Sequence, residues 1–263
     1  MQKLKEIRQT ILQMTHDANV SHVGSALSVV DILYTLYFEV INIIKKSINS
    51  NDRDIVILSK GHASAALYSV LYHKGFITKK DIESYAVDGG MLPCHIDKAK
   101  SPFFEISSGS LGHGLGVGAG MALAKKLDGN QGRVYVICGD GECNEGSIWE
   151  ALMFASTNHL NNLTLIVDFN KLQGFGTTNE IINQFNLEER MAAFGFDTYS
   201  VDGHDINTLK KILLKTSNKP LAIVAHTIKG KGVSFMEDRC EWHYKSPNDE
   251  QLNIALKEIE GRY

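Results

Sequence analysis

The residues with the clearest chemical potential follow two apolar runs in the middle of the chain. Gly139-Asp140-Gly141 comes directly after the run RVYVIC, and Asn170 follows the run LTLIVD. If both runs are parallel strands joined by a helix, their carboxyl ends share one edge of a sheet, so Asp140 and Asn170 should meet there. A carboxylate, an amide oxygen and a backbone carbonyl are hard oxygen ligands that suit Mg²⁺ or Ca²⁺. A diphosphate would then lie against the glycines and the start of the following helix.

Other interpretations of these motifs are weakened by their own spacing. A dinucleotide-binding loop has the pattern GxGxxG, whereas Asn144 stands here in place of the third glycine, and no GxxxxGK[ST] motif occurs. A GDG sequence alone is typical of a tight turn, but the preceding strand and Asn170 favour a ligand site. A zinc site built from Cys94-His95 and Cys240 with His243 lacks the paired spacing of structural zinc sites.

The elements that must position these residues alternate along the chain between short apolar runs and stretches with helical periodicity. This pattern predicts an α/β fold with a mostly parallel sheet flanked by helices. A capping box from Ser28 to Asp31 is expected to open a helix over residues 31–40. No repeat or linker interrupts the pattern, so we expect a single domain over residues 1–263. Strands are expected at 54–59, 133–138, 163–168, 196–201 and 221–226, and helices at 63–74, 145–160, 206–216 and 249–259.

Composition narrows the possible partners and the cellular location. The 263 residues are 43% hydrophobic and 22% charged, with a formal net charge of −3 and no basic stripe, so no nucleic-acid partner is expected. No apolar stretch approaches the roughly 18 residues of a membrane span, and the charged N-terminal helix does not resemble a signal sequence. The four cysteines form no CxxC pair, which favours a reducing compartment, and we expect a cytoplasmic protein.

The spacing from Gly139-Asp140-Gly141 to Asn170 resembles the thiamine-diphosphate motif, and further stretches resemble transketolases over most of the chain. These stretches are ANVSHVGSALS at 18–28, LSKGHA at 58–63, MLPCH at 91–95, SSGSLGHG at 107–114, KGKG at 229–232 and WH at 242–243. The resemblance implies a thiamine-diphosphate-binding fold whose cofactors are thiamine diphosphate and Mg²⁺, with Ca²⁺ or Mn²⁺ able to substitute. It assigns the metal to the Asp140 carboxylate, the Asn170 side chain and the Leu172 carbonyl.

The resemblance also implies a catalytic set around the thiazolium ring and the substrate hydroxyls. Its members are His22, His62, His95, His243 and Glu145. Imidazole can accept and return protons near neutral pH, which suits the transfer of a two-carbon ketol unit. Glu145 would link two active sites across a dimer interface, whereas its structural alternative is an interaction with a helix N-terminus. The implied cofactor-binding residues are His62, Gly109, Ser110, Leu111, Gly141, Glu145, Asn170 and His243.

Four positions depart from the family pattern near the expected substrate side. Cys94 precedes the histidine of the family's GHP segment, and Ile96 replaces its proline. His113 stands where the family generally has glutamine, and Ser110 stands where some members have proline. These departures leave the cofactor assignment in place and leave the ketol donor and acceptor open.

Full-length transketolases resemble this chain only over their first part. Their second domain supplies the glutamate that protonates the aminopyrimidine ring of the cofactor. We therefore expect that this chain is inactive alone and pairs with a separate chain carrying that pyrimidine-binding domain, in an α₂β₂ assembly. The predicted function is ketol transfer between sugars, with sugar phosphates as the expected substrates. The alternatives are a decarboxylating thiamine-diphosphate component, resembling deoxyxylulose-phosphate synthase or a 2-oxo-acid dehydrogenase, and a non-catalytic subunit.

Overall fold

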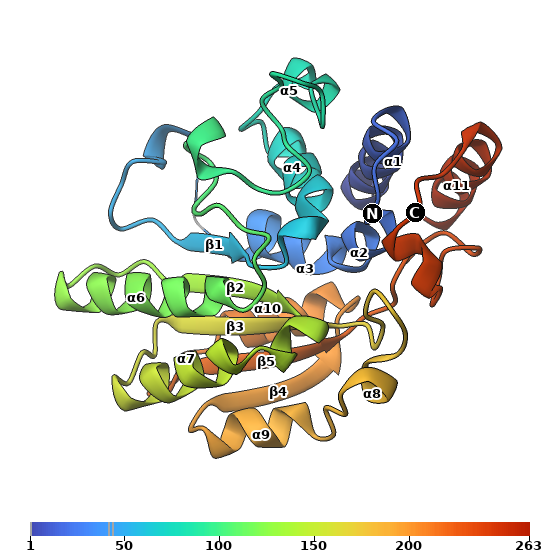
Figure 1. Ribbon diagram of the computed structural model, residues 1–263. Helices are drawn as coiled ribbons and strands as arrows, with labels where there is room; N and C mark the ends of the chain where they lie inside the picture. The colour runs from blue at the N-terminus through green and yellow to red at the C-terminus, as the bar shows by residue number, and fades with distance from the viewer. Residues whose placement is uncertain (1, 42, 44) are drawn as a thin grey trace.

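A parallel sheet of five strands forms the centre of the computed structural model, which describes residues 2–41, 43 and 45–263 (Figure 1). The strands are β1 (Ile55–Leu58), β2 (Val134–Gly139), β3 (Leu163–Phe169), β4 (Asp197–Asp202) and β5 (Leu221–His226). Their order across the sheet is β1-β2-β3-β5-β4, and every neighbouring pair is parallel. The predicted α/β fold with a mostly parallel sheet is confirmed.

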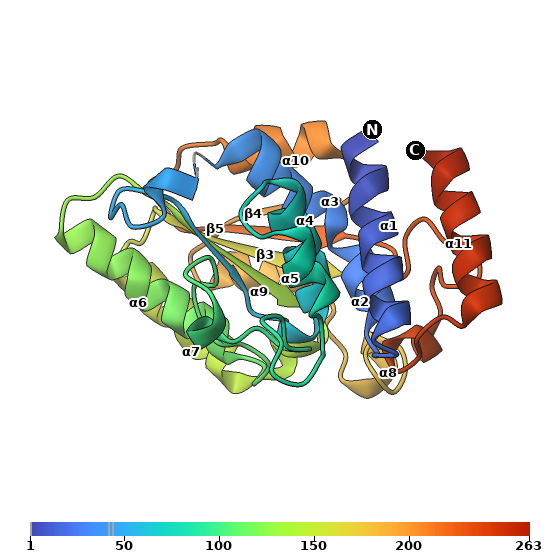
Figure 2. The ribbon, with the colours of Figure 1, turned by 90° about the horizontal axis from the view of Figure 1, so that it is seen from above.

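Helices cover both faces of this sheet, as the view from above shows (Figure 2). One face carries α6 (His113–Leu127), α7 (Gly146–Thr157) and α9 (Leu187–Ala193). The other face carries α1 (Gln2–Asp17), α2 (Val23–Ser28), α3 (Val30–Tyr34), α4 (Ser64–His73) and α10 (Ile206–Leu213). The remaining helices are α5 (Lys79–Glu83), α8 (Thr178–Ile181) and α11 (Asp249–Arg262), with a π-helix at Thr35–Val40 and 3₁₀ turns at Lys45–Ser47, Gly61–Ala63, Lys98–Lys100, Gly141–Asn144 and Cys240–His243.

Alternation of side chains along the strands creates two hydrophobic cores. In β2, Tyr135 and Ile137 point into the core under α1 to α4, whereas Val134, Val136 and Cys138 point into the core under α6 and α7. A strand that is buried on both faces has no polar side to alternate with, so it forms a continuous apolar run. This is why RVYVIC and LTLIVD predicted central strands.

Two helix ends test the predicted boundaries. Gly75, with a φ of 84°, follows α4 and supports the predicted stop, because this left-handed conformation suits glycine. The capping box at Ser28 is wrong, because α3 begins at Val30 with Val29 as its N-cap and without a side-chain cap. The Ser28 hydroxyl instead donates to the buried Asp168 at 2.6 Å. Asp31 does not close a capping box either, because its carboxylate pairs with the buried Arg8 guanidinium of α1 at 2.6 Å.

None of the helices among the described residues combines the length and the apolar character needed to cross a membrane.

Candidate active site

A pocket of about 500 Å³ lies at the carboxyl edge of the sheet, where the loops after β1, β2 and β3 converge. Most of the predicted site residues line it. They are His22, His62, His95, Gly109, Leu111, Asp140, Gly141, Glu145, Asn170, Leu172 and His243. Ser110 is not among the lining residues, and its side chain is exposed beside Leu111. The structure therefore brings residues from positions 22 to 243 to one site, as the motifs predicted.

The predicted meeting of Asp140 with the Asn170 loop is confirmed by direct hydrogen bonds. In the sheet, Gly139 of β2 pairs with Asp168 of β3, so the residues that follow them leave the sheet side by side. The Asp140 carboxylate accepts the backbone N–H of Lys171 at 2.7 Å and that of Gly141 at 2.8 Å. Lys171 adopts a left-handed φ of 65°, an unfavourable conformation that this hydrogen bond helps to hold.

The chemistry of this group of oxygens fits a divalent metal ion. Asp140 is buried, and burial raises the pKa of its carboxyl to about 6. Within the described residues, no lysine, arginine or histidine forms an ion pair with it. A buried carboxylate without a counter-charge is costly, and a cation bound by this carboxylate, the Asn170 amide and the Leu172 carbonyl would remove that cost.

The zinc alternative finds no support in the same part of the chain. Among the described residues, no three His, Cys, Asp or Glu side chains come together in a way that could hold a metal ion. Oxygen donors of mixed kinds, such as those around Asp140, suit Mg²⁺ or Ca²⁺ rather than zinc.

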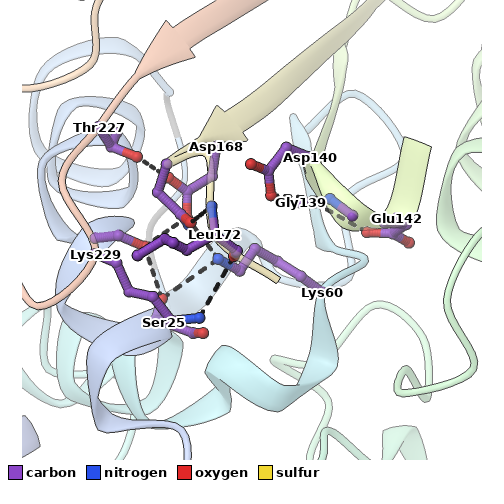
Figure 3. Close-up of polar contacts among 12 residues, drawn as sticks. Ser25, Lys60, Gly139, Asp140, Glu142, Asp168, Leu172, Thr227 and Lys229 are labelled. Carbon is purple, nitrogen blue, oxygen red and sulfur yellow. Dashed lines mark hydrogen bonds and ion pairs between the residues drawn. The ribbon is translucent and has the colours of Figure 1, made fainter. Parts of the chain in front are cut away.

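Lys60 and Asp168 form a buried ion pair beside the pocket, which the sequence alone did not predict (Figure 3). The Lys60 ammonium lies 2.5 Å from the Asp168 carboxylate, which also accepts the hydroxyls of Ser28 and Thr227. Burial alone would raise the pKa of Asp168, but the neighbouring Lys60 charge holds this pKa below its ordinary value. Lys60 also lines the pocket, so it places positive charge where a diphosphate would lie.

A second buried lysine, Lys229, lies next to Leu172 (Figure 3). Its ammonium is 3.4 Å from the Leu172 carbonyl, 3.3 Å from the Gln173 carbonyl and 3.0 Å from Nδ1 of His243. Burial, with the neighbouring charge of Lys60, lowers the pKa of Lys229 to about 8. The only sequence signal for this residue is its place in the KGKG stretch, which by itself indicates no role.

The four predicted histidines form one cluster over the pocket. The ring centroid of His22 lies 5.3 Å from that of His62, 5.8 Å from that of His95 and 4.9 Å from that of His243. The backbone N–H of His22, whose φ is 77°, donates to the carbonyl of His243 at 3.0 Å, which ties the start of α2 to the turn at Cys240–His243. Hydrogen-bonding groups from four separate loops therefore face one small volume.

Burial changes the proton chemistry that we expected of this cluster. It lowers the pKa of His22 to about 4 and that of His243 to about 3, with the charges of Lys229 and Lys60 adding to the effect in both. The pKa of His62 also lies well below its ordinary value, chiefly because of burial. These rings are neutral at neutral pH and act there as hydrogen-bond donors and acceptors.

Two glutamates beside the GDG sequence have different surroundings. Glu142 is buried and accepts the backbone N–H of Gly112 at 2.9 Å and that of Gly139 at 3.1 Å, together with the Ser59 hydroxyl. It therefore ties the ends of β1 and β2 to the start of α6, a role that the sequence did not reveal. Glu145 is exposed, lines the pocket and is the N-cap of α7 without a side-chain cap bond.

Comparison with known proteins matches residues 1–261 to the family described as "Transketolase, thiamine diphosphate binding domain". The chain belongs to the transketolase family. It is 39% identical to a subunit of the apulose-4-phosphate transketolase of Actinobacillus succinogenes, covering 98% of this chain and 94% of that one. It is 37% identical to the 6-deoxy-6-sulfo-D-fructose transketolase subunit SqwG of Clostridium sp., with 97% and 94% covered.

Solved transketolases share this fold over less than half of their own length. The Campylobacter jejuni enzyme superposes with a TM-score of 0.91 at 31% identity, covering 99% of this chain and 43% of that one. The relatives that are named as transketolase subunits are, by contrast, covered almost completely. Because these relatives are transketolases or transketolase subunits, the comparisons favour ketol transfer over the decarboxylating alternative.

Proposed function

We propose that this chain is the thiamine-diphosphate-binding subunit of a two-chain transketolase that moves a two-carbon ketol unit between sugars, with sugar phosphates as the substrate class. The observation that carries the proposal is the meeting of Asp140 with the Asn170 loop beneath four clustered histidines. Both cores pack on one sheet, which supports our treating residues 1–263 as a single domain.

In this proposal the chain's residues divide into a metal group and a diphosphate group. The Asp140 carboxylate, the Asn170 side chain and the Leu172 carbonyl would hold Mg²⁺, for which Ca²⁺ or Mn²⁺ could substitute. Gly141 would let the diphosphate approach the backbone closely. A Cβ atom at this position would lie 3.1 Å from the Gln173 side chain and would narrow the pocket. Lys60 would add positive charge beside it. The remaining proposed cofactor contacts are His62, Gly109, Ser110, Leu111, Glu145 and His243.

Bound thiamine diphosphate would supply the stabilised carbanion that ketol transfer needs. The protein would position the sugar and exchange protons with its hydroxyls. His22, His62, His95 and His243 are proposed for this work, because their ring nitrogens can donate to one oxygen and accept from another. Glu145, exposed at the start of α7, is proposed to lie at a subunit contact and to link two sites.

A separate partner subunit completes the proposed enzyme. Support comes from relatives that are almost fully covered by this chain and are themselves named as single subunits of a transketolase. We propose an α₂β₂ assembly in which the partner contributes the pyrimidine-binding domain and this chain alone does not turn over. We place the enzyme in the cytoplasm, in keeping with four cysteines that are all free thiols.

Calorimetry and a ketol-transfer assay would test this proposal together. The chain mixed with its partner subunit should bind thiamine diphosphate with Mg²⁺ and transfer the ketol unit, whereas either chain alone should not turn over. Absence of cofactor binding in the mixture would refute the assignment. Release of CO₂ from a 2-oxo acid, without ketol transfer, would replace it with the decarboxylating alternative. Full turnover by this chain alone would refute the two-subunit requirement.

A further inference from the structure

A histidine outside the predicted set, His204, lies between α3 and the loop that follows β5. Its Nδ1 is 2.6 Å from the Asp31 carboxylate, and its Nε2 accepts the backbone N–H of Ile228 at 2.9 Å. A backbone N–H can only donate, so Nε2 carries no hydrogen and Nδ1 bears the hydrogen that Asp31 accepts. Asp31 is 3% exposed and is itself held by Arg8. The His204 ring is therefore fixed at both nitrogens in one orientation.

The loop after β5 carries Lys229 directly after Ile228. The path of this loop is confined on its far side as well, because the N–H of Gly230 donates to the carbonyl of Gly24 at 2.9 Å. That contact joins two backbone groups, whereas the contact of Ile228 is made by the His204 side chain. The side chain of His204 therefore sets the position of the residue that precedes Lys229, and a substitution can change it.

The Lys229 ammonium has three hydrogens and lies among three acceptors. These are the carbonyls of Leu172 at 3.4 Å and Gln173 at 3.3 Å, and Nδ1 of His243 at 3.0 Å. An ammonium group has no lone pair, so Nδ1 of His243 has to accept, and the hydrogen of this neutral ring lies on Nε2. Nε2 is the nitrogen that remains for a substrate, and it is a hydrogen-bond donor.

The neighbouring ring of the cluster is not fixed in this way. Nδ1 of His22 lies 2.9 Å from the Ser21 hydroxyl, and a hydroxyl can donate or accept. The rings of His22 and His243, whose centroids are 4.9 Å apart, therefore differ in kind. One can take either tautomer, and the other is held as a donor.

We propose that Asp31 and His204 are positioning residues that act through the loop after β5 on Lys229, and that Lys229 fixes His243 as a hydrogen-bond donor toward the substrate. The consequence for ketol transfer rests on the proposed function, whereas the state of the His243 ring does not. A donor of fixed orientation suits a sugar oxygen on which negative charge develops during the transfer, because the donor needs no reorganisation at that moment.

Nitrogen NMR of the full-length, cofactor-free chain with labelled histidines tests the state of the ring. The protonated and the bare nitrogen of a neutral imidazole have well-separated shifts, and His243→Asn identifies the signals of His243 by their loss. In the wild type, His243 should carry its hydrogen on Nε2 and His204 should carry its hydrogen on Nδ1. A hydrogen on Nδ1 of His243, or a ring that samples both forms, would overturn the proposal.

Two substitutions of His204 separate its two hydrogen bonds. In His204→Gln the amide oxygen can take the place of Nε2 and accept from Ile228, so His243 should keep the wild-type tautomer. In His204→Asn the shorter amide can still donate to Asp31 but leaves the N–H of Ile228 without its acceptor, so His243 should become a mixture of tautomers. Unchanged His243 signals in His204→Asn would refute the part assigned to His204.

Lys229→Met and Ser200→Ala complete the set of variants. Lys229→Met removes the donor to Nδ1, so His243 should lose its single tautomer, and retention of that tautomer would refute the part assigned to Lys229. Ser200→Ala is the matched control, since it removes the hydroxyl that lies 2.8 Å from Nε2 of His226 at the end of β5. It should leave the His243 signals as they are, and a change in this variant would contradict the specific path through His204.

Kinetics of the paired enzyme measure the consequence for catalysis. His204→Asn should lower kcat for ketol transfer by about tenfold or more, because a small displacement of a positioned group is costly, and His204→Gln should recover most of the lost rate. An equal loss of kcat in both variants would show a purely structural histidine and overturn the proposal.

Two outcomes separate this inference from the proposed function. If the paired wild type transfers no ketol unit, the proposed function fails, and the NMR measurement still decides the state of His243. If the paired wild type transfers the ketol unit while His243 carries its hydrogen on Nδ1, the proposed function stands and the positioning role is wrong.

Discussion

Replacing Lys60 by methionine should strongly destabilise the chain, because it leaves the Asp168 carboxylate buried without its counter-charge. The side chains of Lys60 and Asp168 are 2% and 0% exposed, and their charged atoms lie 2.5 Å apart. Breaking a buried pair by removing one partner typically costs about 3–5 kcal/mol. The Ser28 and Thr227 hydroxyls remain as donors to the carboxylate, so we expect a loss of about 3 kcal/mol in the free energy of unfolding.

Urea denaturation of the cofactor-free chain at neutral pH measures this loss directly. Lys79→Met is the matched control, because Lys79 and Glu83 lie 3.6 Å apart with side chains 77% and 61% exposed, and exposed pairs contribute only about 0–1 kcal/mol. Adding Asp168→Asn to Lys60→Met should recover most of the lost stability, since the uncompensated charge disappears. A loss below about 1 kcal/mol for Lys60→Met, or no recovery in the double variant, would refute the reasoning.

Three further predictions follow from the pocket and the sheet. Asp140→Ala should abolish the binding of thiamine diphosphate with Mg²⁺ that calorimetry measures. His22→Ala should keep cofactor binding and lose ketol transfer in the paired enzyme, and an equal loss of cofactor binding in both variants would contradict the assigned roles. Burial raises the pKa of Asp140 from 3.8 to about 6, so the folded, metal-free chain favours the protonated carboxyl. The stability that this preference contributes is complete below pH 3.8 and is lost as the pH rises through about 6. Urea titrations at a series of pH values should show this fall in the free energy of unfolding for the wild type and not for Asp140→Asn. Gly118→Ala should destabilise the chain by about 1–3 kcal/mol, because the added carbon would lie 2.4 Å from the Val136 side chain. Gly116→Ala faces open space and should stabilise the chain by up to about 1 kcal/mol, and urea denaturation measures both changes.

The central part of the fold and the approach of Asp140 to the Asn170 loop could be predicted because their signals are local. Runs such as RVYVIC indicate strands buried on both faces, and parallel strands end at one edge of the sheet, so the sequence alone was enough to predict Asp140 beside the Asn170 loop. The histidines were different. His22 and His243 are separated by most of the chain, and only the resemblance to transketolases predicted that their rings, 4.9 Å apart in the structure, would share one site.

The supporting contacts could not be predicted, because they depend on tertiary burial. Lys60 and Asp168 look like ordinary charged residues in the sequence, and only the assembly of β1, β2 and β3 into one sheet makes them a buried pair. Ser28 shows the same limit. Its spacing to Asp31 has the form of a capping box, but α2 continues through Ser28 and turns its hydroxyl toward Asp168, so a tertiary hydrogen bond replaced the local one.

The neutral state of the buried histidines constrains how protons can move at this site. A ring whose pKa lies near 3 or 4, such as that of His243 or His22, is a weak base at neutral pH and does not hold a proton taken from solvent. Proton movement is therefore expected between a ring nitrogen and a substrate hydroxyl within hydrogen-bond reach, with the charged state short-lived. Lys60 and Lys229 help to impose this condition, since their positive charges disfavour imidazolium, and in the proposed function they would also attract the anionic cofactor. In the proposed function, the same two lysines would therefore act both on the bound cofactor and on the protonation state of the histidines that face the substrate.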